Sequence, residues 1–93
     1  MNATVREQAA DIIGRADTWQ LDVVEGAVHS FCLLSTVWDD RTRVRVRSFL
    51  ATTLNEMLVE EASYRVGRTS EERSYSTLVS QKLAACLVRI NAI

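Results

Sequence analysis

Residues 21–38 read LDVVEGAVHSFCLLSTVW, and this stretch decides how the chain folds. Eleven of its eighteen residues are apolar. Helical spacing sorts most of them into two neighbouring stripes, one with Leu21, Val24, Val28, Phe31 and Trp38 and one with Val23, Ala27, Leu34 and Val37. A helix that is apolar over most of its circumference lies at the centre of a small protein or closes an oligomer. The stretch therefore predicts a central helix, and its charged residues make it too polar to span a membrane.

The length of 93 residues predicts a single domain covering residues 1–93. The chain is 47% hydrophobic and 25% charged, which is typical of a globular protein with one modest core. It has no proline and only three glycines, a composition that favours long helices over a sheet with many turns.

Three further helical segments follow from periodicity and end signals. Thr4 and Glu7 form a capping-box pattern that predicts a first helix ending near Gly14. A third helix over residues 49–66 ends at Gly67, and the sequence after Thr69 repeats the capping-box pattern. The last helix has a regular apolar seam of Val79, Leu83, Cys86, Ile90 and Ile93, widened by Tyr75, Leu78 and Leu87. These segments predict an all-α fold, a small four-helix bundle.

Residues 41–48 read RTRVRVRS and allow two interpretations. As a strand, the segment places four arginines on one face and Thr42, Val44 and Val46 on the other. A strand needs a partner, however, and no other segment alternates in this way, so it would pair with its copy in a dimer. We therefore favour the other interpretation, a helix that begins near Asp40 and continues into the third helix.

The strongest candidate binding residues are Arg41, Arg43, Arg45 and Arg47, which we call the arginine row, together with Trp38. Residues 1–40 carry seven acids and two bases, whereas residues 41–93 carry five acids and nine bases, so the row also balances an acidic first half. Arginine and tryptophan are the residue types that dominate binding energy at protein interfaces. Trp19 and Trp38 lie near the two ends of the apolar helix, and we interpret this composition as a protein-binding surface.

Phosphate is the other ligand that the arginine row suits, which makes nucleic acid the alternative partner. With a strand at residues 41–48, the order strand, helix, glycine, helix is loosely similar to the ribbon-helix-helix DNA-binding modules. That resemblance implies paired strands from two subunits that enter the major groove.

No group of residues predicts catalysis, a metal site or a cofactor. Glu25, His29 and Cys32 share one helix face, but a structural zinc needs four ligands and a nucleophilic cysteine needs an activated, accessible thiol. Cys32 and Cys86 are expected to be reduced thiols packed on apolar faces. We therefore expect no enzyme, and we expect no metal ligands and no cofactor-binding residues.

The sequence predicts a small non-enzymatic helical regulator or adaptor that binds a protein partner and forms a homodimer. The dimer is expected because the central helix and the terminal seam carry more apolar surface than four short helices hide. Without a basic segment followed by an apolar run at the start of the chain, a cytoplasmic location is expected.

Overall fold

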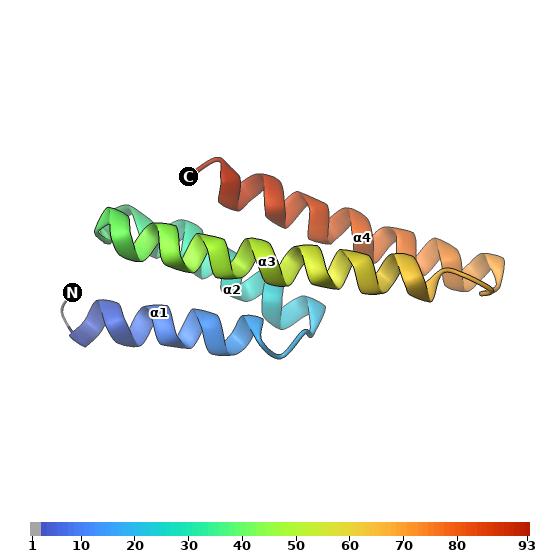
Figure 1. Ribbon diagram of the computed structural model, residues 1–93, viewed down its shortest axis with the longest axis horizontal. Helices are drawn as coiled ribbons and strands as arrows, with labels where there is room; N and C mark the ends of the chain where they lie inside the picture. Colours follow the sequence, from blue (N-terminus) through green and yellow to red (C-terminus); the bar gives the residue numbers. More distant parts are fainter. Residues whose placement is uncertain (1–2) are drawn as a thin grey trace.

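A computed structural model describes residues 3–93 of the chain. It contains four α-helices, α1 (Ala3–Ala16), α2 (Leu21–Leu34), α3 (Asp40–Tyr64) and α4 (Ser70–Asn91), and one short 3₁₀ turn, η1 (Ser35–Val37) (Figure 1). Between residues 3 and 93 there is no strand. The predicted all-α class and the number of helices are confirmed.

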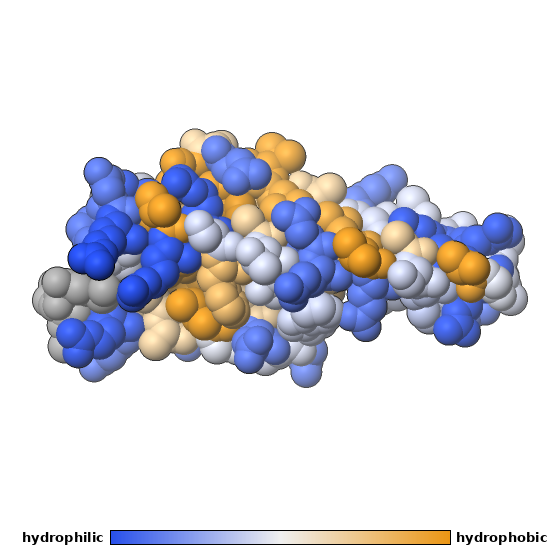
Figure 2. All heavy atoms as spheres, in the orientation of Figure 1, coloured by the Kyte–Doolittle hydropathy of each residue, from blue (hydrophilic) through white to orange (hydrophobic). Residues whose placement is uncertain are grey.

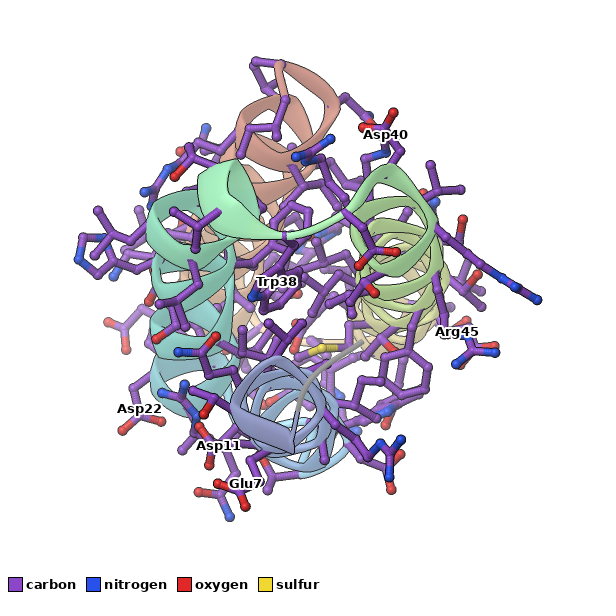
Figure 3. The ribbon with its side chains drawn as sticks, turned by 90° about the vertical axis from the view of Figure 1, so that its left-hand side faces the viewer. Glu7, Asp11, Asp22, Trp38, Asp40 and Arg45 are labelled. Atoms are coloured by element: carbon purple, nitrogen blue, oxygen red, sulfur yellow. The ribbon has the colours of Figure 1, made fainter. Side chains whose placement is uncertain are left out.

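The four helices occupy the corners of a bundle. Seen along its long axis, α1 lies opposite α4 and α2 lies opposite α3 (Figure 3). Both α2 and α3 pack against α1 and against α4, and α3 makes its most extensive contact with α4. The helix predicted over residues 21–38 ends at Leu34, where η1 begins. As α2 it is one corner of the bundle and has the smallest share of exposed residues among the four helices, with only Asp22, His29 and Leu33 exposed on its outer face. Leu33 is 63% exposed on that face, and Val37 in η1 is exposed as well.

The core lies between the four corners and draws residues from every helix. The stripe predicted for residues 21–38 supplies Val24, Val28 and Phe31, which are fully buried. The seam predicted for the last helix supplies Leu83, Cys86 and Ile90. The other buried apolar residues are Ala9, Ile12, Ala16, Ala27, Trp38, Val46, Leu50, Leu54, Met57 and Val79. Because Leu83 and Ile90 are buried inside one chain, the terminal seam does not by itself require a second copy.

Residues 41–48 form the first turns of α3, which decides between the two interpretations of this segment. Asp39 is the N-cap, and Thr42 donates a hydrogen bond to its carboxylate at 2.5 Å. This bond lowers the pKa of the Asp39 carboxyl. Thr42 and Val46, one turn apart, face the core, so burial on a helical period of four outweighs the alternation of two in the sequence.

The glycines differ from their predicted roles. Gly14 lies inside α1, which continues to Ala16, so the prediction that it ends this helix is wrong. Gly67 has a φ of +75° in the turn between α3 and α4, a left-handed conformation that glycine adopts without a steric penalty. The α3 helix ends at Tyr64, two residues before the predicted end, and the turn at Gly67 reverses the chain.

A complete capping box begins α4, as predicted. The Glu72 backbone N–H donates to Thr69 Oγ1 at 3.2 Å, while the Thr69 backbone N–H and hydroxyl donate to Glu72 Oε1 at 3.4 and 2.9 Å. These bonds from Thr69 lower the pKa of the Glu72 carboxyl. The box therefore fixes where the α3–α4 turn ends.

We expect Thr69→Ala to reduce the free energy of unfolding by about 1 kcal/mol, the usual cost of losing an N-cap side chain. Because folding depresses the pKa of Glu72, its stabilising effect is present above the unfolded pKa and is lost as the pH falls through the folded value. Urea unfolding at neutral pH checks the first expectation, and NMR titration of Glu72 checks the second. In Thr69→Ala the Glu72 pKa should rise toward its ordinary value; an unchanged pKa would contradict the assignment.

The helices are of unequal length, and this shapes the molecule. The 25 residues of α3 and the 22 of α4 span about 37 and 33 Å, whereas α1 and α2, with 14 residues each, span about 21 Å. The α3–α4 hairpin therefore projects beyond the link between α1 and α2 (Figure 1), and the chain measures 49 × 22 × 16 Å. We call the projecting part, residues 58–80, the arm. None of the described helices is both long and apolar enough to cross a bilayer.

The two cysteines are unbridged, in agreement with the sequence-based expectation. Cys86 is buried where α4 faces the core, and this burial raises the pKa of its thiol. Cys32 is half-buried on α2.

Candidate partner-binding site

The arginine row is divided between two sides of α3, because residues two positions apart on a helix differ by about 200°. Arg43 turns toward the α2–α3 connection, where its Nε donates to the Ser35 carbonyl at 3.0 Å and its Nη2 donates to the Trp38 carbonyl at 2.8 Å. It also pairs with Asp40. These contacts assign Arg43 a structural role at this connection.

Arg47 lies one turn further along the same side of α3. Its Nη1 donates to the backbone carbonyl of Ile93 at 3.0 Å, so it ties the end of the chain to α3. Arg43 and Arg47 thus bind parts of their own chain.

Arg41 and Arg45 lie on the other side of α3 and are exposed. With Asp39 and Thr42 they line an open hollow of about 240 Å³, and Figure 3 shows Arg45 extending away from the bundle. Neither guanidinium forms an ion pair with any residue from 3 to 93. The structure therefore leaves two of the four arginines of the row free for a ligand.

Trp38 is not a surface residue. Its side chain is 4% exposed, its ring meets that of Phe31 edge to face with centroids 6.0 Å apart, and its Nε1 donates to Gln8 Oε1 at 3.0 Å. Its predicted place on a binding surface is therefore wrong: the apolar ring closes the end of the core, and the N–H is satisfied within the chain.

The absence of a strand at residues 41–48 also removes the basis for the resemblance to ribbon-helix-helix modules, since the ribbon would come from this segment. On α2, His29 is exposed, and its Nδ1 lies 3.5 Å from Arg89 Nη2. Within the part of the chain that is described, no three histidine, cysteine, aspartate or glutamate residues are grouped to hold a metal ion.

The arm is the other exposed feature, and polar contacts hold its two helices together. Ser76, which is fully buried, donates to Glu61 Oε2 at 2.6 Å. Arg65 Nη1 donates to Ser80 Oγ at 2.7 Å and approaches Ser76 Oγ at 3.4 Å. In the bundle the same helix pair is held by leucine and isoleucine, so the apolar contact between α3 and α4 gives way to a hydrogen-bonded one along the arm.

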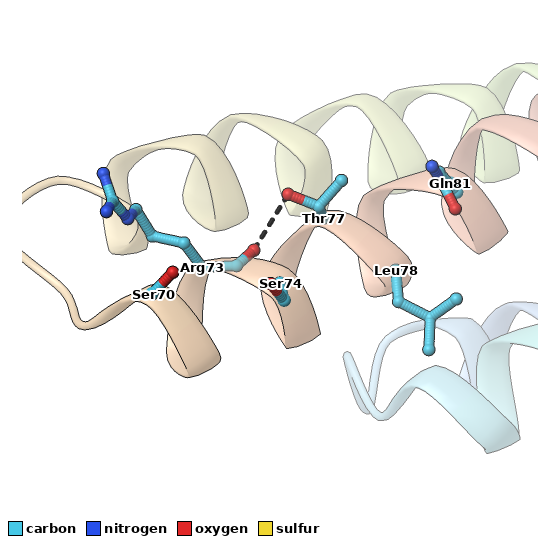
Figure 4. Close-up of a pocket in the computed structure, with 6 residues that line it drawn as sticks. All are labelled: Ser70, Arg73, Ser74, Thr77, Leu78 and Gln81. Carbon is cyan, nitrogen blue, oxygen red and sulfur yellow. Dashed lines mark hydrogen bonds between the residues drawn. The ribbon is translucent and has the colours of Figure 1, made fainter.

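Apolar side chains of the arm are instead exposed on its surface. On one side of the arm they continue the apolar stripes that α1 and α2 cover in the bundle. On α3, Tyr64 lies seven residues after the buried Met57, and on α4, Tyr75 lies four residues before the buried Val79. Residues at these spacings share one face of a helix. Leu78 follows beside Tyr75, and in Figure 4 its side chain points toward the link between α1 and α2. Spots of high hydropathy are visible along the projecting hairpin in Figure 2.

Trp19 stands where the arm leaves the bundle. It lines a hollow of about 110 Å³ together with Met57, Glu60 and Glu61. We give the name aromatic notch to the exposed apolar side chains at this hollow and along the adjoining arm, Trp19, Tyr64, Tyr75 and Leu78. It contains all three exposed aromatic residues of the described chain, with exposures of 38% for Trp19, 40% for Tyr64 and 69% for Tyr75.

The backbone of Trp19 is in an unusual conformation, with a φ of +56°. A bulky residue rarely adopts this left-handed region, where glycine or asparagine is preferred after a helix. Trp19 therefore combines an unfavourable backbone conformation with a large aromatic side chain. Strained backbone conformations are concentrated at functional sites in proteins, so the indole of Trp19 is a candidate functional group.

Charged side chains lie close to the aromatic residues of the notch. Glu60 and Glu61 lie beside Trp19, and the Tyr64 hydroxyl donates to Glu72 Oε2 at 3.2 Å. The Arg68 guanidinium lies 4.3 Å from the centroid of the Tyr64 ring, a cation–π contact within the chain. The notch thus combines aromatic surface with carboxylates.

The outer face of α4 adds a shallow groove of about 440 Å³ next to Leu78 (Figure 4). Its lining is mostly hydroxyl and amide, from Ser70, Ser74, Thr77 and Gln81, with Arg73 at one end. Thr77 donates to the Arg73 carbonyl at 2.8 Å. The residues that line this groove include no histidine, cysteine or carboxylate that could activate a hydroxyl. The groove shares Leu78 with the notch and is otherwise polar.

The sequence did not predict the notch, because it assigned Tyr75 and Leu78 to the core-facing stripe of the last helix. That stripe is real, but α2 begins at Leu21 and does not reach far enough along α4 to cover them. The signal that was present in the sequence is the difference in length between the first two helices and the last two.

Comparison of the chain with protein-family models, curated proteins and solved structures finds no match.

Proposed function

We propose that this chain is a small non-enzymatic helical adaptor or regulator that binds a protein partner through the aromatic notch. The observation that carries the proposal is that the three exposed aromatic residues of the described chain, Trp19, Tyr64 and Tyr75, all lie on the arm or where it leaves the bundle. Tryptophan and tyrosine contribute most to binding energy at protein interfaces, since each buries a large area and loses few rotamers.

The construction of the arm supports this role. Two helices joined by polar contacts gain little from mutual apolar burial, and none of the other helices in residues 3–93 lies across the open side of the arm. A partner that covers Tyr64, Tyr75 and Leu78 removes apolar surface from water at roughly 25 cal/mol per Å². Binding therefore supplies the arm with the apolar packing that the bundle obtains from α1 and α2.

The test compares what three forms of the protein capture from its native host. Trp19→Gly removes the indole and relieves the left-handed backbone, so its free energy of unfolding is expected to stay within about 1 kcal/mol of the parent value. Tyr75→Ser removes an exposed ring from α4. The matched control is Val37→Ser, since Val37 is exposed at the opposite end of the bundle.

We expect at least one protein to be captured by the parent and by Val37→Ser and to be lost with both Trp19→Gly and Tyr75→Ser. Capture that is indifferent to all three substitutions would contradict a binding role for the notch. Urea unfolding of each variant separates lost binding from lost structure.

A second candidate function is nucleic-acid binding, and it rests on Arg41 and Arg45. Arg45 also lines a hollow of about 180 Å³ with Arg6 of α1, so three arginines lie near one another at this end of the bundle. Phosphate binding here would weaken steeply between low and moderate salt, whereas apolar docking at the notch would change far less. A salt titration with a mixed-sequence duplex, comparing the parent with Arg41→Ala plus Arg45→Ala, distinguishes the two functions.

A further inference from the structure

We propose that the partner of the aromatic notch is the arm of a second copy of this chain, docked antiparallel so that each arm lies across the other. This inference rests on the proposed binding role of the notch. It defines a symmetric dimer in which two helices from each chain form one four-helix unit.

The helix faces that α1 and α2 cover in the bundle continue along the arm. In the bundle, α1 covers the face of α3 that includes Thr42 and Val46, and α2 covers the face of α4 that includes Cys86. Along the arm these same faces continue through Tyr64 and Tyr75 but have no helices opposite them. What fits there is another pair of antiparallel helices at the usual spacing of 8–10 Å, as in the bundle itself. A second arm is such a pair.

Charge is distributed unevenly along the arm. At its tip, Arg68, Arg73 and the half-buried Arg65 outnumber the exposed Glu71 and the half-buried Glu72, which leaves a small positive excess. At its base, near Trp19, the exposed charged side chains include Asp17, Asp22 and Glu60. An antiparallel arrangement brings the basic tip of each arm to the acidic base of the other, whereas a parallel arrangement would bring tip to tip and base to base. Charge complementarity of this kind fixes the orientation of an interface.

The turn at the tip of the arm carries an exposed apolar residue. Val66 is 80% exposed between Arg65 and Gly67, which is unusual for an apolar residue in a tight turn. In the antiparallel dimer this turn meets the link between α1 and α2 of the other copy, where Trp19 offers an apolar surface. Each two-fold-related contact occurs twice, so modest contacts are doubled in effect.

The experiment measures mass by light scattering coupled to gel filtration over a range of micromolar concentrations. We expect the parent to approach twice its chain mass of 10.5 kDa. Arg68→Asp alone and Asp17→Arg alone are each expected to weaken the dimer about tenfold, because each turns two attractive contacts into repulsive ones. The double variant Arg68→Asp plus Asp17→Arg restores the contacts with reversed sign and is expected to recover parent-like association.

This rescue is specific to the second copy, since Arg68 and Asp17 of one chain lie at opposite ends of the arm and cannot compensate each other within it. The control is Arg41→Asp and Glu7→Arg, an equivalent change of charges on exposed residues at the other end of the bundle, which should leave the mass unchanged. Circular dichroism of each variant shows whether its helices are intact.

A mass of 10.5 kDa at every concentration would overturn the dimer, as would a dimer whose association is insensitive to the single swaps or is not restored by the double swap. The capture experiment above tests the notch independently of this result. If the chain is monomeric and the notch variants still lose a captured protein, then the adaptor function stands and only the identity of its partner is wrong.

Discussion

Replacing Phe31 with alanine is expected to lower the free energy of unfolding by about 3–5 kcal/mol, the usual range for a core phenylalanine. Phe31 is fully buried between the helices, and its ring supports the buried indole of Trp38 edge to face. Truncation removes this aromatic contact and leaves a cavity beside the indole. Since domains of this size have a total stability of about 5–15 kcal/mol, the variant is expected to lie near the limit of folding.

Urea unfolding followed by far-UV circular dichroism measures this loss. Leu33→Ala is the matched control, because Leu33 lies two residues further along the same helix but on its exposed face. Its substitution should change the free energy of unfolding by only about 0.5 kcal/mol. If both variants lost the same amount, the assignment of inner and outer faces of α2 would be wrong.

These two residues also show what the sequence of residues 21–38 could predict. Helical spacing correctly placed Val24, Val28 and Phe31 on one buried face, since periodicity is a local property of the chain. It did not predict that α2 has neighbours on only part of its circumference. How many helices surround a given helix depends on the whole arrangement, and so Leu33, which belongs to neither predicted stripe, and Val37 of the second stripe are exposed.

The helix ends divide in the same way. The capping box at Thr69 was predictable because it joins residues three apart and needs no tertiary contact. The end of α1 was not predictable in this way. A glycine inside a helix costs about 1 kcal/mol, and packing against the core can outweigh that cost and extend the helix beyond it. Ile13 and Ala16 are buried or partly buried against the core, and their packing extends α1 past Gly14.

The candidate site was the least predictable part. The alternation in residues 41–48 is as regular as that of a strand, but the buried positions are Thr42 and Val46, which a helix brings to one face. Trp38 was assigned to a surface by its residue type alone, and its partner Gln8 lies 30 residues away in the sequence. The aromatic notch depends on how far α1 and α2 extend along α3 and α4. This is a property of the whole arrangement and cannot be predicted from a local sequence pattern.

Replacing different members of the arginine row is expected to change the free energy of unfolding by different amounts. Arg43→Ala should lower the free energy of unfolding by about 2–3 kcal/mol, as is usual when hydrogen bonds from a charged donor are lost. Arg43 donates to the carbonyl groups of Ser35 and Trp38, which stand in the connection between α2 and α3. Without the guanidinium these carbonyls lose their charged donor, and the connection that holds Trp38 over the core is loosened.

Arg41→Ala is the matched control, since Arg41 is exposed two positions earlier and forms no ion pair with the described residues. We expect it to change the free energy of unfolding by less than about 0.5 kcal/mol. Urea unfolding of both variants provides the comparison, and the near-UV circular dichroism of Trp38 should change only in Arg43→Ala. Equal losses in the two variants would contradict the division of the row, because Arg43 would then contribute no more to stability than the exposed Arg41.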